Sequence, residues 1–488
     1  RPIDSKGKAP SVDKLFRNNG DNTFSDVSKE AKILFEGFGL GVEICDLNKD
    51  GWPDVYVSND FLTDDILYIN QKDGTFENKI GEYFEHLTFN GMGNDIADIN
   101  NDGLMDVVVL DMLPADNKRK KLTMMGNNYD EFQNGLSFGH QPQYIRNTLQ
   151  LNNGNGSFSE IGQLAGISAT EWSWSALFAD FDQDGFKDLY ITNGYRQDIT
   201  NLDFMVYGNR ILTMGTEEAN RKERLKELNK LPGIKIKNYF YKNTANLGFE
   251  NFSDKAGIKK PTYSNGMAYA DFDNDGDLDL VINNIDDPAG VFENRSERNP
   301  LMNYIKFKFK GNSKNIDGLG SQVEIRANGK KQLGYNTPYR GYLSSVEHGI
   351  HFGLGNVKTI DTVIVTWPDG KKQLITDLPA GKEYFLDYSN ALELDEKHVI
   401  TSSVPTRNFH LKDSTTINFV HQEDNFVDYK IQPLLPHMHS RNGPGLSVGD
   451  INGDGLEDCF IGGAAAQHGA LMIQQPNKQF TKIEFQDP

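Results

Sequence analysis

The chain has 488 residues, of which 37% are apolar and 24% charged, so two to four folded domains are expected. Its 69 acidic and 50 basic residues give a formal net charge of −19, which disfavours nucleic acid and anionic membranes as partners. No apolar run reaches the roughly 18 residues that a membrane-spanning helix needs, so we expect no transmembrane segment.

The cysteine content is low. Cys45 and Cys459 stand far apart, each beside an apolar run. Two residues cannot form a disulfide framework, so we predict two buried free thiols in strands, with a disulfide between them as the alternative.

An acidic segment of nine residues recurs five times. The copies are DLNKDGWPD at 46–54, DINNDGLMD at 98–106, DFDQDGFKD at 180–188, DFDNDGDLD at 271–279 and DINGDGLED at 450–458. A short stretch rich in small apolar residues precedes each copy, and a β-rich run such as VYVSN or LYITN follows it. Each acidic segment is therefore predicted to join two strands.

A second element recurs between the acidic segments. It consists of an apolar strand, an Asn/Gly/Asp turn and a Phe that opens another strand, as in LYINQKDGTF at 67–76 and LQLNNGNGSF at 149–158. One full unit is then four short strands in about 50 residues, which is typical of a propeller blade.

The spacing of the acidic segments locates two insertions. One lies near 111–144 and the other near 195–238. Residues 217–230, EEANRKERLKELNK, have a helical charge pattern, and we expect either a solvated surface helix or a site where a partner docks.

The predicted fold class is all-β. Residues 1–299 form a β-propeller of four-stranded blades with acidic loops, and alternating strands at 300–392 form a small β-sandwich-like domain. Residues 393–414 are a polar linker, and residues 415–488 are the first blade of a second propeller.

The acidic loops have the composition of a calcium site. Side chains at positions 1, 3, 5 and 9 and the backbone carbonyl of position 7 supply hard oxygen ligands, and Gly at position 6 permits a sharp turn. No His or Cys lies inside the loops, which disfavours zinc and copper, and magnesium is second choice because it demands octahedral geometry. The helix–loop–helix calcium motif is excluded because position 12 is Val or Ile and the flanks are strands.

About five structural Ca²⁺ ions are expected, because several carboxylates in one loop repel each other without a cation. The predicted ligands are Asp46, Asn48, Asp50, Trp52 and Asp54; Asp98, Asn100, Asp102, Leu104 and Asp106; Asp180, Asp182, Asp184, Phe186 and Asp188; Asp271, Asp273, Asp275, Asp277 and Asp279; and Asp450, Asn452, Asp454, Leu456 and Asp458.

Other candidate site residues favour structural roles. Trp172 and Trp174 alternate in a strand and are predicted to pack between blades, with sugar stacking as the alternative. His348 and His351 are expected to pack or to donate hydrogen bonds, and His437 and His439 have no third metal ligand placed by the sequence.

These repeats resemble the FG-GAP/VCBS family, whose calcium loops are similar to those of integrin α-subunit propellers. Residues 318–332, 340–355 and 363–373 resemble the ASPIC/UnbV domain, a combination also found in the cartilage acidic protein family and in large bacterial surface proteins. The resemblance implies a seven-bladed propeller, with further blades upstream, in an exported or lipid-anchored protein of the cell surface or outer membrane.

The sequence therefore predicts a calcium-binding extracytoplasmic scaffold without catalytic residues. Extracellular calcium modules bind at about 10⁻⁴–10⁻³ M, a range that cytosolic calcium does not reach, which places the protein outside the cytoplasm. The expected partner is a surface protein or a glycan. A further hypothesis is that the chain is an accessory subunit of an outer-membrane import complex and binds its transporter. The enzymatic alternative is a lyase-like propeller that acts on acidic polysaccharides with calcium.

Overall fold

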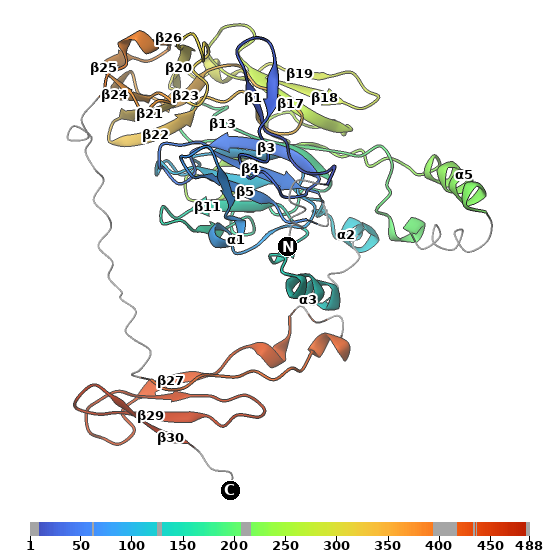
Figure 1. The fold of residues 1–488 in the computed structure, drawn as a ribbon, viewed down its shortest axis with the longest axis vertical. Coiled ribbons are helices and arrows are strands. Elements are labelled where there is room, and N and C mark those ends of the chain that lie inside the picture. The colour runs from blue at the N-terminus through green and yellow to red at the C-terminus, as the bar shows by residue number, and fades with distance from the viewer. Residues whose placement is uncertain are drawn as a thin grey trace. The chain divides into compact units, whose positions relative to one another are not determined.

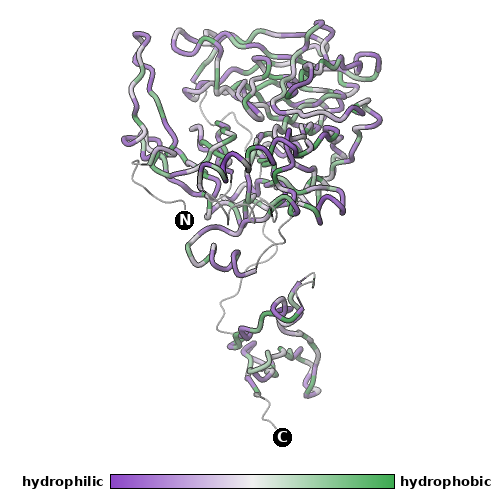
Figure 2. Tube along the Cα trace, turned by 90° about the vertical axis from the view of Figure 1, so that its right-hand side faces the viewer, coloured by the Kyte–Doolittle hydropathy of each residue, from purple (hydrophilic) through white to green (hydrophobic). Residues whose placement is uncertain are grey.

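The structure is a computed structural model that describes residues 9–60, 63–123, 129–205, 216–393, 417–432, 435 and 437–484. The chain forms two compact units, Arg1–Asp395 and Glu396–Pro488, and Figure 1 shows that strands make up most of both. In Figure 2, hydrophobic segments gather toward the inside of the larger unit, and the loops at its edges are mostly hydrophilic.

Four antiparallel sheets carry the first four acidic loops. The strands in sheet order are β3 (Gly39–Cys45), β4 (Asp54–Asn59), β5 (Ile66–Asn70) and β6 (Phe76–Asn78); β8 (Asn94–Ala97), β9 (Asp106–Val109), β11 (Thr148–Asn152) and β12 (Phe158–Glu160); β13 (Ser173–Ala179), β14 (Asp188–Asn193), β15 (Tyr239–Asn243) and β16 (Phe249–Asn251); and β17 (Ser264–Ala270), β18 (Asp279–Asn284) and β19 (Gly290–Phe292). Every acidic loop joins the first two strands of its sheet, as predicted.

The sheets stack as successive blades. Strand β3 contacts β8, β8 contacts β13 and β13 contacts β17, so the first strands of neighbouring blades lie side by side. Large apolar clusters fill the space between blades, because each sheet has two faces to bury. The all-β fold built of propeller-type blades is confirmed.

The remaining elements of this region are short. A hairpin joins β1 (Phe16–Asn18) to β2 (Phe24–Asp26), and β7 (Leu87–Thr88) pairs in parallel with β10 (Gln143–Tyr144). Helices include α1 (Ile80–Tyr83), α2 (Asn117–Thr123), α3 (Tyr129–Phe138) and α5 (Glu217–Leu228), so a helix within 217–230 is confirmed. None of the helices that the structure describes has both the length and the apolar character to span a bilayer.

Residues 303–387 form two facing sheets. The first is ordered β23 (Ile350–Gly355), β20 (Asn303–Lys310) and β26 (Lys382–Asp387), and the second is ordered β22 (Lys330–Tyr335), β21 (Gln322–Ala327), β24 (Thr359–Thr366) and β25 (Lys372–Pro379). Phe307, Phe352, Val363 and Trp367 pack between them, which is the predicted sandwich-like arrangement. The short helices η1 (Ser296–Arg298) and η2 (Tyr388–Asn390) flank it.

The sandwich packs against the blades within the first unit. The guanidinium of Arg340 donates to both carboxylate oxygens of Asp95, at 2.7 and 2.6 Å, and to the Tyr269 hydroxyl at 2.7 Å. The Tyr342 N–H donates to Ser175 Oγ at 3.1 Å, and the Glu347 N–H donates to the Tyr269 carbonyl. One loop of the sandwich thus reaches blades two, three and four.

The second unit holds the fifth acidic loop in a four-stranded antiparallel sheet. Its strands are β27 (Leu446–Gly449), β28 (Asp458–Ile461), β29 (Ala470–Gln474) and β30 (Phe480–Glu484), with η5 (Asp428–Lys430) and η6 (His439–Arg441) before them. Cys459 in β28 and Cys45 in β3 are buried free thiols, as predicted. The predicted linker 393–414 lies, apart from Glu393, outside the described residues.

Candidate metal centres

The acidic loops share one internal hydrogen-bond pattern. In the first loop, Asp46 accepts the N–H groups of Asp50 and Gly51 at 3.0 and 2.9 Å, and Asp50 accepts the Trp52 N–H at 2.9 Å. The second, third and fifth loops repeat these bonds. Carboxylates that cap nearby N–H groups curl the backbone into a tight turn.

Two positions of every loop have left-handed backbone. Position 6 is the expected glycine, with φ of 87° at Gly51 and 96° at Gly185. Position 4 is also left-handed, with φ of 59° at Lys49 and 62° at Asn274, a conformation uncommon outside glycine and asparagine. The left-handed backbone therefore recurs at the same two positions in all five loops.

The aspartate at position 9 is buried in every loop. Asp54, Asp106, Asp188 and Asp458 have no exposed surface, and Asp279 is 4% exposed. In the first loop, Asp54 Oδ2 accepts the Leu47 N–H and Asp54 Oδ1 accepts the Asn70 N–H, both at 3.0 Å. The other four position-9 residues make the same pair of bonds, so this residue ties its loop to the third strand of its own blade.

A second repeated residue, which the sequence reasoning missed, joins neighbouring blades. Asn152 Nδ2 donates to the Leu47 carbonyl of the preceding blade at 3.0 Å. Asn243 donates likewise to the Ile99 carbonyl, and Asn294 to the Phe181 carbonyl. The sequence pattern that could have indicated this residue is an Asn at the end of the third strand of a repeat, or just after it.

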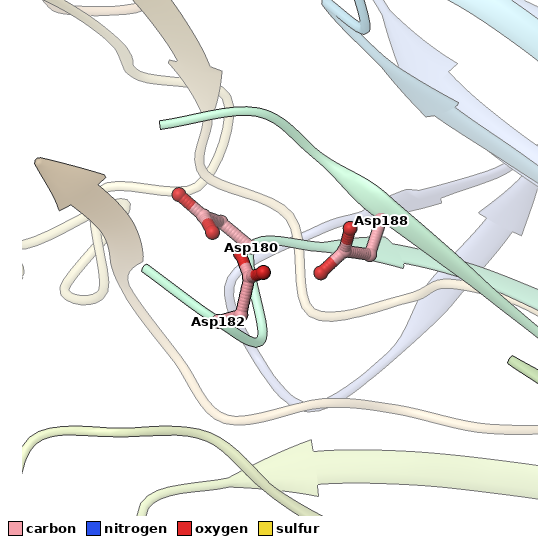
Figure 3. A group of neighbouring side chains, drawn as sticks. All are labelled: Asp180, Asp182 and Asp188. Carbon is pink, nitrogen blue, oxygen red and sulfur yellow. The ribbon is translucent and has the colours of Figure 1, made fainter. Parts of the chain in front are cut away.

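Three carboxylates converge in the third loop. Asp180, Asp182 and Asp188 each place one oxygen within 4.8 Å of the others, and Figure 3 shows them on the loop and at the start of β14. Asp182 Oδ1 is buried without a hydrogen-bond partner. This orphaned anionic oxygen and the all-oxygen donor set fit a hard divalent cation.

The fourth loop forms two such groups. Asp271, Asp273 and Asp275 make one group, in which Asp271 Oδ1 is a buried oxygen without a partner, and Asp275, Asp277 and Glu297 make the other. In the first, second and fifth loops, position 3 is Asn48, Asn100 or Asn452. There the amide nitrogen donates to the position-5 carboxylate, at 3.1, 2.9 and 2.9 Å.

Burial raises the pKa values of aspartates in the first three loops. Desolvation raises the pKa of Asp54 and of Asp180 to about 7 and that of Asp98 to about 6, with a further contribution from neighbouring aspartates. Burial, more than the neighbouring carboxylates, therefore disfavours the charged form of these three aspartates.

Lysine side chains approach three of the loops as counter-charges, and one of them is Lys306, whose ammonium lies 3.7 Å from Asp271 in the fourth loop. The Lys242 ammonium pairs with the carboxylates of Asp182 and Asp184, and Lys72 lies 3.4 Å from Asp50. Lys242 comes from β15, the third strand of the same blade. The third loop therefore attracts positive charge from the protein itself.

The predicted position-7 residues differ in their side chains. Trp52 is 45% exposed, whereas the Asp277 carboxylate turns inward and accepts from Ser296. Trp172 and Trp174 are buried and stack with Tyr195, at ring-centroid distances of 4.0 and 5.8 Å, so their packing role is confirmed. His351 hydrogen-bonds the Gly276 carbonyl at 3.0 Å, as expected for a structural histidine.

Comparison with known proteins finds two family matches within the chain. The FG-GAP-like repeat matches residues 7–57, 46–109 and 139–191, and the ASPIC and UnbV family matches residues 311–393. The chain is also similar to cartilage acidic protein 1 of Xenopus tropicalis, with 24% identity over 372 residues. That match covers 72% of this chain and 45% of the relative, so the chain spans less than half of the relative's length.

Proposed function

We propose that this chain of FG-GAP-like repeats and an ASPIC and UnbV domain is an extracytoplasmic scaffold whose blades are held together by bound calcium. The observation that carries the proposal is the convergence of Asp180, Asp182 and Asp188 around the unpartnered, buried Asp182 Oδ1. An ion there would join the loop to the first residue of β14. Since a ligand that binds only the folded state stabilises it, calcium adds to the stability of the blades.

The role of the protein's own residues follows from the hydrogen bonds. Position-1 and position-9 aspartates hold the turn through backbone N–H groups, so the turn exists before the ion arrives. The remaining oxygens at positions 3 and 5 supply negative charge toward the interior of the turn. Calcium contributes charge neutralisation when bound, and no reaction is assigned to it.

The partner we propose is a surface protein or a glycan. FG-GAP-like repeats suggest a protein-binding role, and the relative is a cartilage protein by name. Placement outside the cytoplasm rests on the same relative and on the calcium range expected of such loops. Membership of an outer-membrane import complex predicts co-purification with a transporter.

Calcium removal tests the structural role. The melting temperature of the chain is measured in excess calcium, in excess magnesium and after chelation with EGTA. We expect a fall of several degrees on chelation that calcium restores and magnesium restores less. Asp182→Asn keeps the shape of the loop and removes one charge, so its melting temperature is expected to respond less to calcium than that of the wild type. Identical melting curves with and without calcium would remove the basis of the proposal.

A binding role rather than a catalytic one is also open to test. Incubation with acidic polysaccharides such as alginate, pectate and hyaluronan, followed by ultraviolet detection of unsaturated uronates, separates the two. We expect no calcium-dependent product, whereas its appearance would establish the lyase alternative.

A further inference from the structure

The fourth acidic loop differs from the others at position 7. It carries Asp277, where the other loops have Trp52, Leu104, Phe186 and Leu456. With this carboxylate the fourth loop has five acidic residues, against three or four in each of the others. Its side chain is turned inward and is only 1% exposed.

The two oxygens of Asp277 have different surroundings. Oδ2 accepts the Ser296 N–H at 2.9 Å, the Ser296 hydroxyl at 3.0 Å and the Glu297 N–H at 3.3 Å. Oδ1 is buried and has no hydrogen-bond partner. A buried carboxylate oxygen with no partner is costly, and such an oxygen marks a place where a cation or donor is missing.

Two further carboxylates converge on Asp277. Asp275, Asp277 and Glu297 each place one oxygen within 4.8 Å of the others. Asp275 is also a member of the Asp271, Asp273 and Asp275 group, so it belongs to both clusters. Glu297 does not come from the loop at all, but from η1, in the segment that leads from β19 into the sandwich.

No positive side chain within the described residues is paired with Asp275 or Asp277, whereas Lys242 serves the third loop in this way. Glu297 itself lies 3.2 Å from Arg298 and is partly exposed. The cluster is therefore anionic, lacks a counter-charge at its buried end and is open at the Glu297 side.

We propose that Asp275, Asp277 and Glu297 form a second divalent-cation site beside the first site of the fourth loop, with Asp275 shared between the two. Three carboxylates and water make a hard oxygen site suited to calcium. Because Glu297 lies outside the loop, this ion fastens the segment entering the sandwich to the last blade before it. The site goes beyond the loop sites of the proposed function, and its occupancy is counted separately from theirs.

Ion counting by native mass spectrometry at saturating calcium tests the site. Asp277→Asn retains an oxygen acceptor for Ser296, and Glu297→Gln changes a partly exposed side chain, so both variants are expected to fold. We expect each to bind one calcium fewer than the wild type. Glu293→Gln is the matched control, because Glu293 also pairs with a nearby arginine, Arg295, but lies in neither cluster, and it is expected to keep the full number.

Asp273→Asn separates this site from the loop site. Asp273 belongs only to the first cluster, so its loss is expected to affect the loop ion. Wild-type ion counts in both Asp277→Asn and Glu297→Gln would overturn the second site, even if Asp273→Asn lost an ion. Full counts in all three variants, or no bound calcium in the wild type, would overturn the loop site and the second site together.

Discussion

The side-chain amide of Asn152 donates a hydrogen bond to the backbone carbonyl of Leu47, 3.0 Å away and one blade earlier. The same amide bonds the Met105 carbonyl of its own loop at 3.2 Å, and the Asn152 N–H donates to Asp106. One buried residue therefore joins the acidic loop of its own blade to the loop of the preceding one. Asn243 and Asn294 repeat the arrangement, so the candidate metal loops and the contacts between blades are parts of one polar network.

This network predicts a large effect for a small substitution. Asn152→Asp keeps the shape but removes the amide donor and buries a charge beside two carbonyls. The expected loss is about 3 kcal/mol of unfolding free energy, measured by denaturant titration. Asn70→Asp is the matched control, because the Asn70 amide occupies the same position in the first blade but donates only to the Pro53 carbonyl at 3.1 Å in an exposed setting. Equal losses in the two variants would show that the contact between blades contributes nothing.

The contact between sandwich and blades rests on Arg340. Its partner Asp95 is fully buried, and the nearby Glu43 Oε1 has no hydrogen-bond partner. Arg340→Met leaves two buried carboxylates without a cation, so we expect a loss of about 3–5 kcal/mol in the unfolding free energy. Arg326→Met, which removes a partly exposed pair with Glu324, is expected to cost about 1 kcal/mol or less. A cost for Arg340→Met as small as that for Arg326→Met would contradict this account.

Lys242 is expected to compete with calcium for the third loop. Removing its charge in Lys242→Met leaves Asp182 and Asp184 without their counter-charge, so the metal-free protein should melt lower and bind calcium more tightly. Melting curves in EGTA and calorimetric titration with calcium measure the two effects. Lys237→Met, which removes an exposed pair with Asp254, is the control and should change neither. Weaker calcium binding in Lys242→Met would contradict the competition.

The raised aspartate pKa values predict the pH dependence of the metal-free protein. Asp54, Asp180 and Asp111 have pKa values of about 7 in the fold because of burial, against about 4 in the unfolded chain. Between these values the folded state holds more protons than the unfolded state, so stability falls as pH rises from 5 to 8. Burial lowers the pKa of His351 to about 3, so this residue makes stability rise with pH below pH 6.5. The several aspartates outweigh this single histidine.

Calcium should flatten this profile, because an ion favours the deprotonated loops. Melting temperatures from pH 5 to 8, with calcium and with EGTA, measure the difference. Asp111 lies outside the loops, so a part of the slope is expected to remain in calcium. A metal-free melting temperature that rises across this range would refute the assignment of buried, protonated aspartates.

Local sequence patterns predicted much of the architecture. Five copies of one spacing, each between apolar runs of strand length, predicted the strand pairs around every acidic loop, and the charge pattern at 217–230 predicted α5. These features depend on neighbours along the chain: turn residues fix the loop, and alternation of apolar residues fixes the strand. The local sequence did not indicate that the fourth blade has three strands, or that the backbone at Lys49 and Gln183 is left-handed.

The sequence by itself determined the repeat, its strand content and the oxygen-rich chemistry of its loops. Only the tertiary structure decided which of these oxygens already accept hydrogen bonds, because that depends on burial and on partners far along the chain. Asp54 bonds Asn70 and Asn152 bonds Leu47 through contacts that no local pattern encodes. The tertiary structure also brings Glu297 close to Asp277, since a residue outside a motif joins a cluster only when the chain between them folds back.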